Sequence, residues 1–217
     1  MKKYIVILLI IFSFTIVIIN FSDAVSVYEI LVDIEYNKLY LLKDDVCLKT
    51  YDVSSGKYST PSPLGTFKII SKDTWGEGFG GHWMGFNVPW GKYGIHGTNE
   101  PYSIGHPASH GCIRMKNSEV KELYNIVPHG TKVVISGGPF GPFNNGFRVL
   151  KPGNTGSDVY EVQKRLKELG YFSGYVNGTF DKNTENAIYK IQQAKGLPKR
   201  NLIGWSEYNA MNIYLIE

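Results

Sequence analysis

The sequence has few cysteines and little net charge, and each shortage excludes a class of protein. Two cysteines in 217 residues exclude a disulfide scaffold and a zinc site of four thiolates. A formal net charge of +4 is too small to indicate a nucleic-acid-binding protein. Aromatic residues make up 14% of the chain, which favours ordered, β-rich structure over a disordered chain or a coiled coil. At about 100–200 residues per domain, the length indicates one or two domains.

Long apolar runs are scarce as well, and the one that exists lies at the amino terminus. Lys2 and Lys3 precede an apolar run over residues 4–19. Basic residues ahead of an apolar core are typical of an export signal, and the run lacks the polar face of a surface helix. We expect residues 1–24 to be a cleaved signal peptide or a retained membrane anchor, and the sequence leaves both open. Either way, we expect the remainder of the chain to work outside the cytoplasm, and a retained segment would add membrane contact through residues 4–19.

Alternation of apolar and polar side chains predicts strands in the first part of the chain. Residues 27–54 are expected to form a meander of three short strands. Three more strands are expected at residues 66–71, 83–88 and 131–136. Cys47 lies among alternating apolar residues, so we expect a thiol packed in the core, while pairing with Cys112 stays open.

Apolar residues at steps of three and four predict helices in the rest of the chain. Asn117 is expected to cap the first helix. A segment rich in Gly, Pro and Asn follows at residues 137–147 and is interpreted as a linker. Beyond it, Ser157 and Asp181 are expected to cap two helices, and a third spans about residues 205–213. Three short helices make a small bundle near the minimum size for independent folding.

The side chains with the most chemistry lie in two segments, His96–Thr98 and Ser109–Arg114. A cysteine reacts as its thiolate, so Cys112 needs a base or a cation nearby, and each segment supplies a histidine. Gly111 allows a sharp turn that aims backbone N–H groups at one point, which stabilises an oxyanion during acyl transfer. Arg114 adds a fixed positive charge that suits a substrate carboxylate.

Zinc binding is the alternative interpretation of two histidines and a cysteine in such short segments. Zinc sites commonly take four ligands in short-spaced pairs, and only one cysteine lies here. His82 and His106 are interpreted as surface or substrate-groove residues. We therefore expect a nucleophilic cysteine that works without a metal or a cofactor.

Residues 95–115 read IHGTNEPYSIGHPASHGCIRM and closely resemble the active-site motif of the L,D-transpeptidase (YkuD) family. That motif is an upstream His, a variable spacer, and Ser/Thr-His-Gly-Cys followed by a hydrophobic residue. The chain has Arg114 where many members have Asn. Residues 59–67, STPSPLGTF, also resemble the family's Thr-Pro-x-Gly-x-Phe segment.

The tail resembles a second family, the three-helix type of peptidoglycan-binding domain. The resemblance is carried by Leu150–Gly153, Gly156–Val159, Asn177–Phe180 and the helices between and after them. The two resemblances imply a multidomain chain. Its expected parts are a mainly-β catalytic domain, a β-sandwich with short helices, at 27–136, the linker at 137–147, and a small all-α three-helix bundle at 148–217.

The resemblance implies a cysteine acyltransferase that acts on peptidoglycan in the cell wall or at the outer face of the membrane. It would join a donor tetrapeptide stem to the amine of an acceptor stem in a 3→3 cross-link and release the terminal D-Ala. The implied roles are Cys112 as nucleophile, His96 as general base and acid, the Gly97 carbonyl as its orienting group, His110 and Gly111 at the oxyanion site, and Arg114 and Ser109 at the substrate. Two alternatives stay open: an L,D-carboxypeptidase of the same fold and a non-catalytic wall-binding protein. We expect a monomer that binds no nucleic acid.

Overall fold

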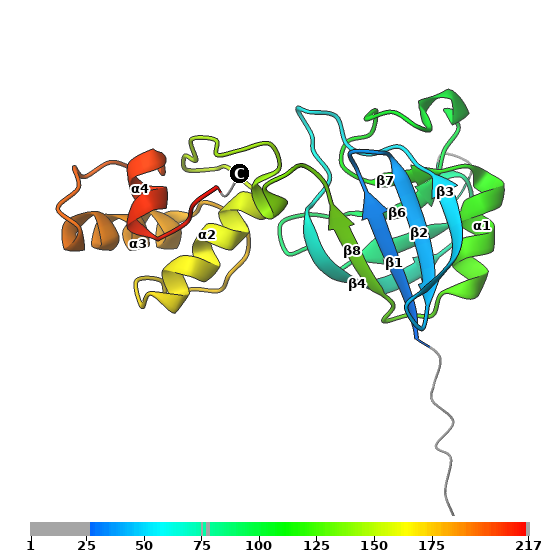
Figure 1. The fold of residues 1–217 in the computed structure, drawn as a ribbon, viewed down its shortest axis with the longest axis horizontal. Helices are drawn as coiled ribbons and strands as arrows, with labels where there is room; N and C mark the ends of the chain where they lie inside the picture. Colours follow the sequence, from blue (N-terminus) through cyan, green and yellow to red (C-terminus); the bar gives the residue numbers. More distant parts are fainter. Residues whose placement is uncertain (1–26, 75, 77–78, 216–217) are drawn as a thin grey trace, which may run out of the picture.

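The protein consists of a β-rich part and a helical part, which lie side by side (Figure 1). The computed structural model describes residues 27–74, 76 and 79–215. The expected export segment, residues 1–24, lies outside these described residues. Among the helices of the described ranges, none has the length and apolar character to cross a membrane.

Eight strands of the β-rich part join in the order β3-β2-β1-β8-β4-β5-β6-β7. The expected meander and the three later strands are confirmed, and β6 and β7 are two short strands that the sequence analysis did not identify. Their bounds are β1 Tyr28–Asp33, β2 Lys38–Lys43, β3 Val46–Asp52, β4 Gly65–Asp73, β5 Trp83–Phe86, β6 Gly94–Gly97, β7 Ile113–Met115 and β8 Lys132–Ser136. A bridge between Ser54, just beyond β3, and Arg114 of β7 brings the two edges of the sheet together.

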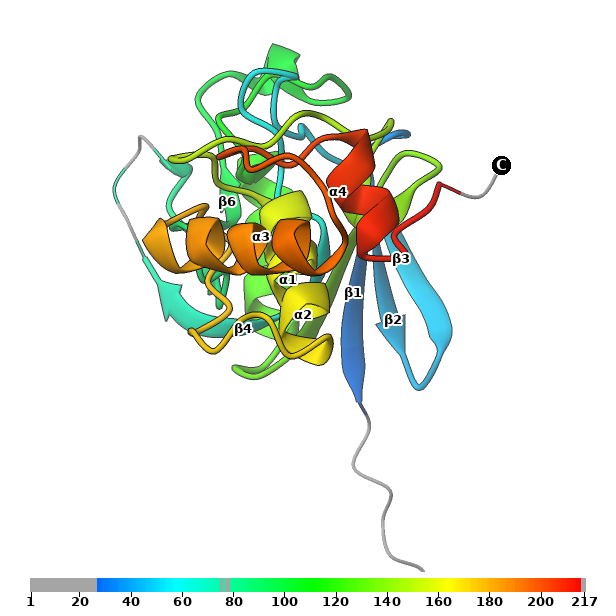
Figure 2. The same ribbon diagram turned by 90° about the vertical axis from the view of Figure 1, so that its left-hand side faces the viewer.

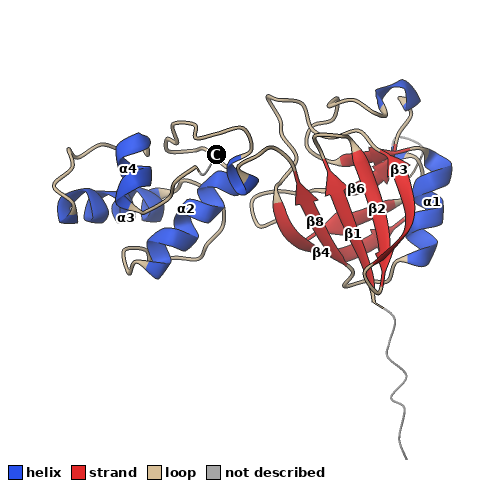
Figure 3. Ribbon diagram, viewed as in Figure 1, coloured by secondary structure: helices blue, strands red, loops and turns tan. Residues whose placement is uncertain are grey.

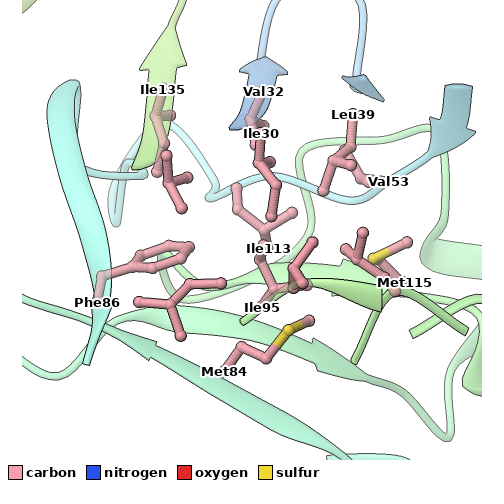
Figure 4. Packing of buried hydrophobic residues seen from close by; sticks show 14 of the residues in the cluster. Ile30, Val32, Leu39, Val53, Met84, Phe86, Ile95, Ile113, Met115 and Ile135 are labelled. Carbon is pink, nitrogen blue, oxygen red and sulfur yellow. The ribbon is translucent and has the colours of Figure 1, made fainter. Parts of the chain in front are cut away.

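The sheet folds over one hydrophobic core. Figure 4 shows apolar side chains of β1, β2 and β8 pointing toward those of β5, β6 and β7. Ile30, Ile95 and Ile113 are fully buried there. Burying aliphatic side chains of this size contributes about 1.5–3 kcal/mol each to folding. The mainly-β, sandwich-like character that the sequence predicts is therefore present.

Helix α1, Asn117–Ile126, covers the edge of the β-rich part away from the other helices (Figure 3). Its Val120 and Leu123 are fully buried in the same core. The capping prediction for Asn117 is wrong, because Lys116 occupies the N-cap position and Asn117 is the first helical residue. The Asn117 side chain instead accepts a hydrogen bond from the Thr98 N–H at 2.8 Å, and so ties the helix to the active-site loop.

The helical part contains the three expected helices, which face the viewer in Figure 2. Asp181 caps the second helix as expected, since its carboxylate accepts a hydrogen bond from the Thr184 N–H. Gly156, not Ser157, is the N-cap of the first. The helices are α2 Ser157–Glu168, α3 Lys182–Ala194 and the shorter α4 Trp205–Ala210. They enclose a second apolar core with no member in common with the first.

The prediction that Cys47 packs in the core is wrong. Its thiol is exposed on β3, as are the neighbouring side chains of Val46 and Leu48. Residues 46–50 of β3 are all exposed, so both faces of this half of the strand are open to solvent. Both cysteines are free thiols, and the alternative Cys47–Cys112 disulfide is not formed.

Candidate active site

The parallel pairing of β6 with β7 places the expected catalytic residues on one face. The register sets Ile95 beside Ile113 and His96 beside Arg114. Successive side chains of a strand point to opposite faces, so the two isoleucines enter the core while His96 and Arg114 face outward. Cys112 precedes β7 by one residue and lies on the same side as Arg114. These three side chains line one pocket of about 370 Å³.

His96 is held as a neutral base. The ring Nδ1 lies 2.5 Å from the Gly97 carbonyl oxygen, and a carbonyl only accepts, so Nδ1 carries the proton and Nε2 keeps its lone pair. Burial lowers the pKa of His96 below 6.5, the nearby charge of Arg114 lowers it further, and the Gly97 hydrogen bond opposes both effects. Only 6% of His96 is exposed. The rings of Phe79 and Trp83 contact it, with centroids 5.1 and 5.8 Å away.

Burial favours the protonated form of the Cys112 thiol. Burial raises the pKa of Cys112 above 9.0, although a hydrogen bond from the Gly94 backbone and the charge of Arg114 favour the thiolate. A protonated thiol that shares a pocket with a neutral imidazole needs its proton removed during attack. The pair therefore suits general-base catalysis more than a preformed thiolate–imidazolium pair.

The turn before Cys112 is braced by Ser109. Its hydroxyl donates to the Cys112 carbonyl at 2.6 Å and accepts from the Gly111 N–H at 3.0 Å. Ser109 is only 1% exposed, so its hydroxyl fixes the turn, and its predicted contact with substrate stays a prediction. Because the Gly111 N–H is engaged by Ser109, the N–H groups of His110 and Cys112 are the donors that remain for an oxyanion.

Position 111 needs a residue that tolerates a positive φ and that has no Cβ, and only glycine meets both requirements. Its φ is +111°, a conformation that side chains rarely adopt. A Cβ built on it would lie 2.6 Å from the Tyr93 ring and 3.1 Å from the Pro61 carbonyl oxygen. The turn that presents Cys112 therefore depends on the absence of a side chain at residue 111.

We expect Gly111→Ala to lower the free energy of unfolding by about 1–3 kcal/mol more than Gly105→Ala does. Gly105 is the matched control, because its φ is +90° and nothing lies within 4 Å of its added Cβ. Chemical denaturation of the two variants gives the comparison. Equal losses would mean that the strain at Gly111 is only that of its backbone conformation.

The outer wall of the pocket carries an ion pair that sequence reasoning did not find. An Arg114 guanidinium nitrogen lies 2.6 Å from a Glu100 carboxylate oxygen. The Arg114 side chain is 17% exposed and that of Glu100 is 51% exposed, so the pair borders on solvent. A substrate carboxylate would have to compete with Glu100 for Arg114.

Most of the predicted site residues come together, and several unpredicted ones join them. The pocket is lined by Phe79, His96, Thr98, Asn99, Glu100, Ser109, His110, Cys112 and Arg114. Gly111 lies behind it, against Tyr93. Phe79 falls in a glycine-rich stretch and Glu100 in a loop, where no periodicity indicates which way a side chain points. Within the described ranges, no three His, Cys, Asp or Glu side chains are grouped so that they could hold a metal ion.

Two parts of the chain match known families. Residues 27–135 match the YkuD family, described as "L,D-transpeptidase catalytic domain". Residues 155–199 match a family described as "Putative peptidoglycan binding domain". The first match covers the whole pocket described above, and the second begins just before α2.

Curated relatives match about half of the chain. The chain is 43% identical over 124 residues to "Putative L,D-transpeptidase YkuD" of Bacillus subtilis strain 168, covering 56% of this chain and 74% of that protein. It is 33% identical over 114 residues to "Probable L,D-transpeptidase ErfK/SrfK" of Escherichia coli K12, covering 49% of this chain and 36% of that protein.

Solved structures of L,D-transpeptidases match about half of the chain as well. The catalytic domain of an E. faecium L,D-transpeptidase matches with 30% identity and a TM-score of 0.44, over 50% of this chain and 95% of that one. An L,D-transpeptidase from Mycobacterium smegmatis matches with 23% identity and a TM-score of 0.45, over 51% of this chain and 59% of that one. The match thus spans about three fifths of the length of the mycobacterial protein.

Proposed function

The chain belongs to the L,D-transpeptidase (YkuD) family, and from this premise we propose that it is a cysteine L,D-transpeptidase. In this proposal it forms 3→3 cross-links between peptidoglycan stem peptides through a Cys112 acyl-enzyme. The observation that carries it is that Cys112 and His96 line one pocket, with Nδ1 of His96 bonded to the Gly97 carbonyl so that Nε2 is the nitrogen left to accept a proton. Such a pair suits acyl transfer and needs no metal.

In the first half-reaction, the Cys112 sulfur attacks the carbonyl carbon of the third residue of a donor tetrapeptide. The thiol proton passes to Nε2 of His96, and the new oxyanion lies near the N–H groups of His110 and Cys112. When the intermediate collapses, the C–N bond to the terminal D-Ala breaks. His96 then returns its proton to the leaving amine, which leaves a thioester on Cys112 and a neutral imidazole.

In the second half-reaction, the amine of an acceptor stem attacks the thioester carbonyl. His96 takes the proton that the amine loses and gives it to the departing Cys112 sulfur, so the resting thiol is restored. Water in place of the amine would give an L,D-carboxypeptidase with the same residues. Arg114 is the cation available for charge on the donor, provided that a substrate carboxylate displaces Glu100.

The second family match supports a location on the cell wall. A peptidoglycan-binding region on the same chain raises the local concentration of wall substrate at the active site. We propose that the enzyme acts outside the cytoplasm, on the wall or at the outer face of the membrane. Export through residues 1–24 remains a prediction from the sequence.

Product analysis tests the proposed reaction. The full chain, kept in solution with a mild detergent because of its apolar amino-terminal run, is mixed with purified disaccharide-tetrapeptide, and the products are weighed by mass spectrometry. We expect a cross-linked dimer that has lost one D-Ala. A tripeptide monomer alone would identify water as the acceptor and contradict the transpeptidase in favour of the carboxypeptidase. Unchanged substrate, with no adduct on Cys112, would contradict both.

A further inference from the structure

A groove between the two parts of the protein has no role in the chemistry described above. It is formed by the loop at residues 58–64, by Trp90 and Tyr93, and by the segments at 142–148 and 153–158, and we name it the interdomain groove. It encloses about 670 Å³, within the usual range for a ligand site. His110 lines both this groove and the Cys112 pocket, so the two spaces adjoin.

The walls of the interdomain groove are held together by direct contacts between the two parts. The Leu64 N–H donates a 2.7 Å hydrogen bond to the hydroxyl of Ser157, the first residue of α2. The rings of Trp90 and Tyr160 lie 5.5 Å apart. Trp90 also lies against Gly178, where an added Cβ would approach the indole ring to 2.3 Å. The helical part is therefore seated on the β-rich part through Trp90.

The segment expected to be a linker forms the third wall and is itself anchored. The Phe147 ring stacks on Tyr208 with centroids 4.1 Å apart. The Tyr208 hydroxyl donates to the Arg148 carbonyl at 3.0 Å. Phe143 packs edge-on against the same tyrosine. Residues 142–148 are thus packed against the helical part. All three walls of the groove are held by contacts within the protein.

The lining of the groove suits a neutral, hydroxyl-rich ligand with flat apolar faces. Tyr58, 93% exposed, and Trp90 present aromatic rings. Arg148 and Asp158 neutralise each other in an ion pair. Apart from the imidazole of His110, the polar side chains that remain carry hydroxyl or amide groups, among them those of Ser59, Asn144, Asn145 and Thr155. Aromatic faces bind the C–H faces of sugar rings, while hydroxyl and amide groups bind sugar hydroxyls.

We propose that the interdomain groove binds the glycan chain of the peptidoglycan strand whose stem peptide enters the Cys112 pocket. The inference rests on the proposed function for the identity of the strand. Residues 155–158 of the groove wall fall within the peptidoglycan-binding match, and the adjoining pocket receives the stem. The helical part then completes a composite site, in addition to tethering the enzyme.

Titration with peptide-free glycan chains of four disaccharide units tests the groove on the full chain. Tyr58→Ala removes an exposed ring from the catalytic wall, and Tyr175→Ala is its control, since Tyr175 is 78% exposed and lines neither space. Gly178→Ala places a Cβ too close to the Trp90 ring and so displaces this wall of the groove. Its control is Gly196→Ala, because Gly196 has nearly the same φ, +66° against +67°, with nothing within 4 Å of its added Cβ.

We expect both test variants to bind the glycan about three- to tenfold more weakly than the wild-type chain, and both controls to bind it as the wild type does. A test variant that binds like its control overturns the composite groove. So does a wild-type chain that binds no peptide-free glycan. Binding needs no turnover, so a chain that binds through the groove but makes no cross-link contradicts only the proposed reaction.

Discussion

Cys112→Ala is expected to abolish cross-linking, with turnover falling by about 10⁴-fold or more. The pocket keeps its shape in this variant, since the brace from Ser109 reaches the Cys112 backbone carbonyl and not its side chain. What is lost is the sulfur that carries the acyl group between the two half-reactions. Mass spectrometry of the products from disaccharide-tetrapeptide gives the turnover. Glycan binding, which uses the interdomain groove, is expected to persist.

The exposed thiol of Cys47 supplies a control variant for Cys112→Ala, and it is also a second position that a thiol-reactive probe can label. Cys47→Ala removes the other free cysteine of the chain and is expected to leave turnover at the wild-type level. Because Cys47 is exposed, a thiol-reactive probe such as a carbapenem can also reach it, so the adduct has to be located by peptide mapping. An adduct on Cys47 alone, or wild-type turnover in Cys112→Ala, would contradict the assignment of the nucleophile.

The sequence predicted the site because its chemistry is local in the chain. Ser109 to Arg114 carry the proposed nucleophile, the turn glycine and the cation within six consecutive positions. His96 lies farther away in the sequence, and the alternation of side chains along β6 and β7 decides which way it points. Because Ile95 and Ile113 enter the core, the side chain of His96 faces the pocket. Burial of the same isoleucines therefore orients the side chains of His96 and Arg114 toward the pocket.

Residues with a tertiary partner were the ones that local rules misjudged. Asn117 and Ser157 both follow the pattern of helix caps, yet each side chain bonds a backbone N–H from a distant segment, of Thr98 and Leu64 respectively. A capping rule considers only residues close in sequence, so it cannot account for a distant backbone N–H that binds the same side chain. Glu100 was missed for the same reason, because its pairing with Arg114 depends on how the loop folds.

Cys47 shows a different limit of pattern reading. Alternation predicts that a strand has two unlike faces, but it does not say where in the sheet the strand lies. Residues 46–50 of β3 are exposed on both faces, so no other described part of the chain covers the apolar side chains there. The pattern was read correctly as a strand and wrongly as a buried one.

His96→Gln is expected to lower kcat/KM at neutral pH by about 10²–10⁴-fold, the usual contribution of a general base. Glutamine keeps a polar side chain at a buried position but cannot accept the thiol proton and return it. His129→Gln is the control, because His129 is exposed and its Nε2 contacts only the Ile70 carbonyl. Rates of acylation for both variants and the wild type give the comparison.

The pH profile separates loss of a base from simple damage to the pocket. In the wild type, falling pH protonates His96 and removes the base, and because burial lowers its pKa, the acid limb should have its midpoint below 6.5. In His96→Gln no base assists, so the thiolate must form unaided, and burial raises the pKa of Cys112 above 9.0. Its rate should therefore climb about tenfold per pH unit through the alkaline range, from about pH 7 to about pH 9. A flat profile in the variant would assign His96 a structural role in place of a catalytic one.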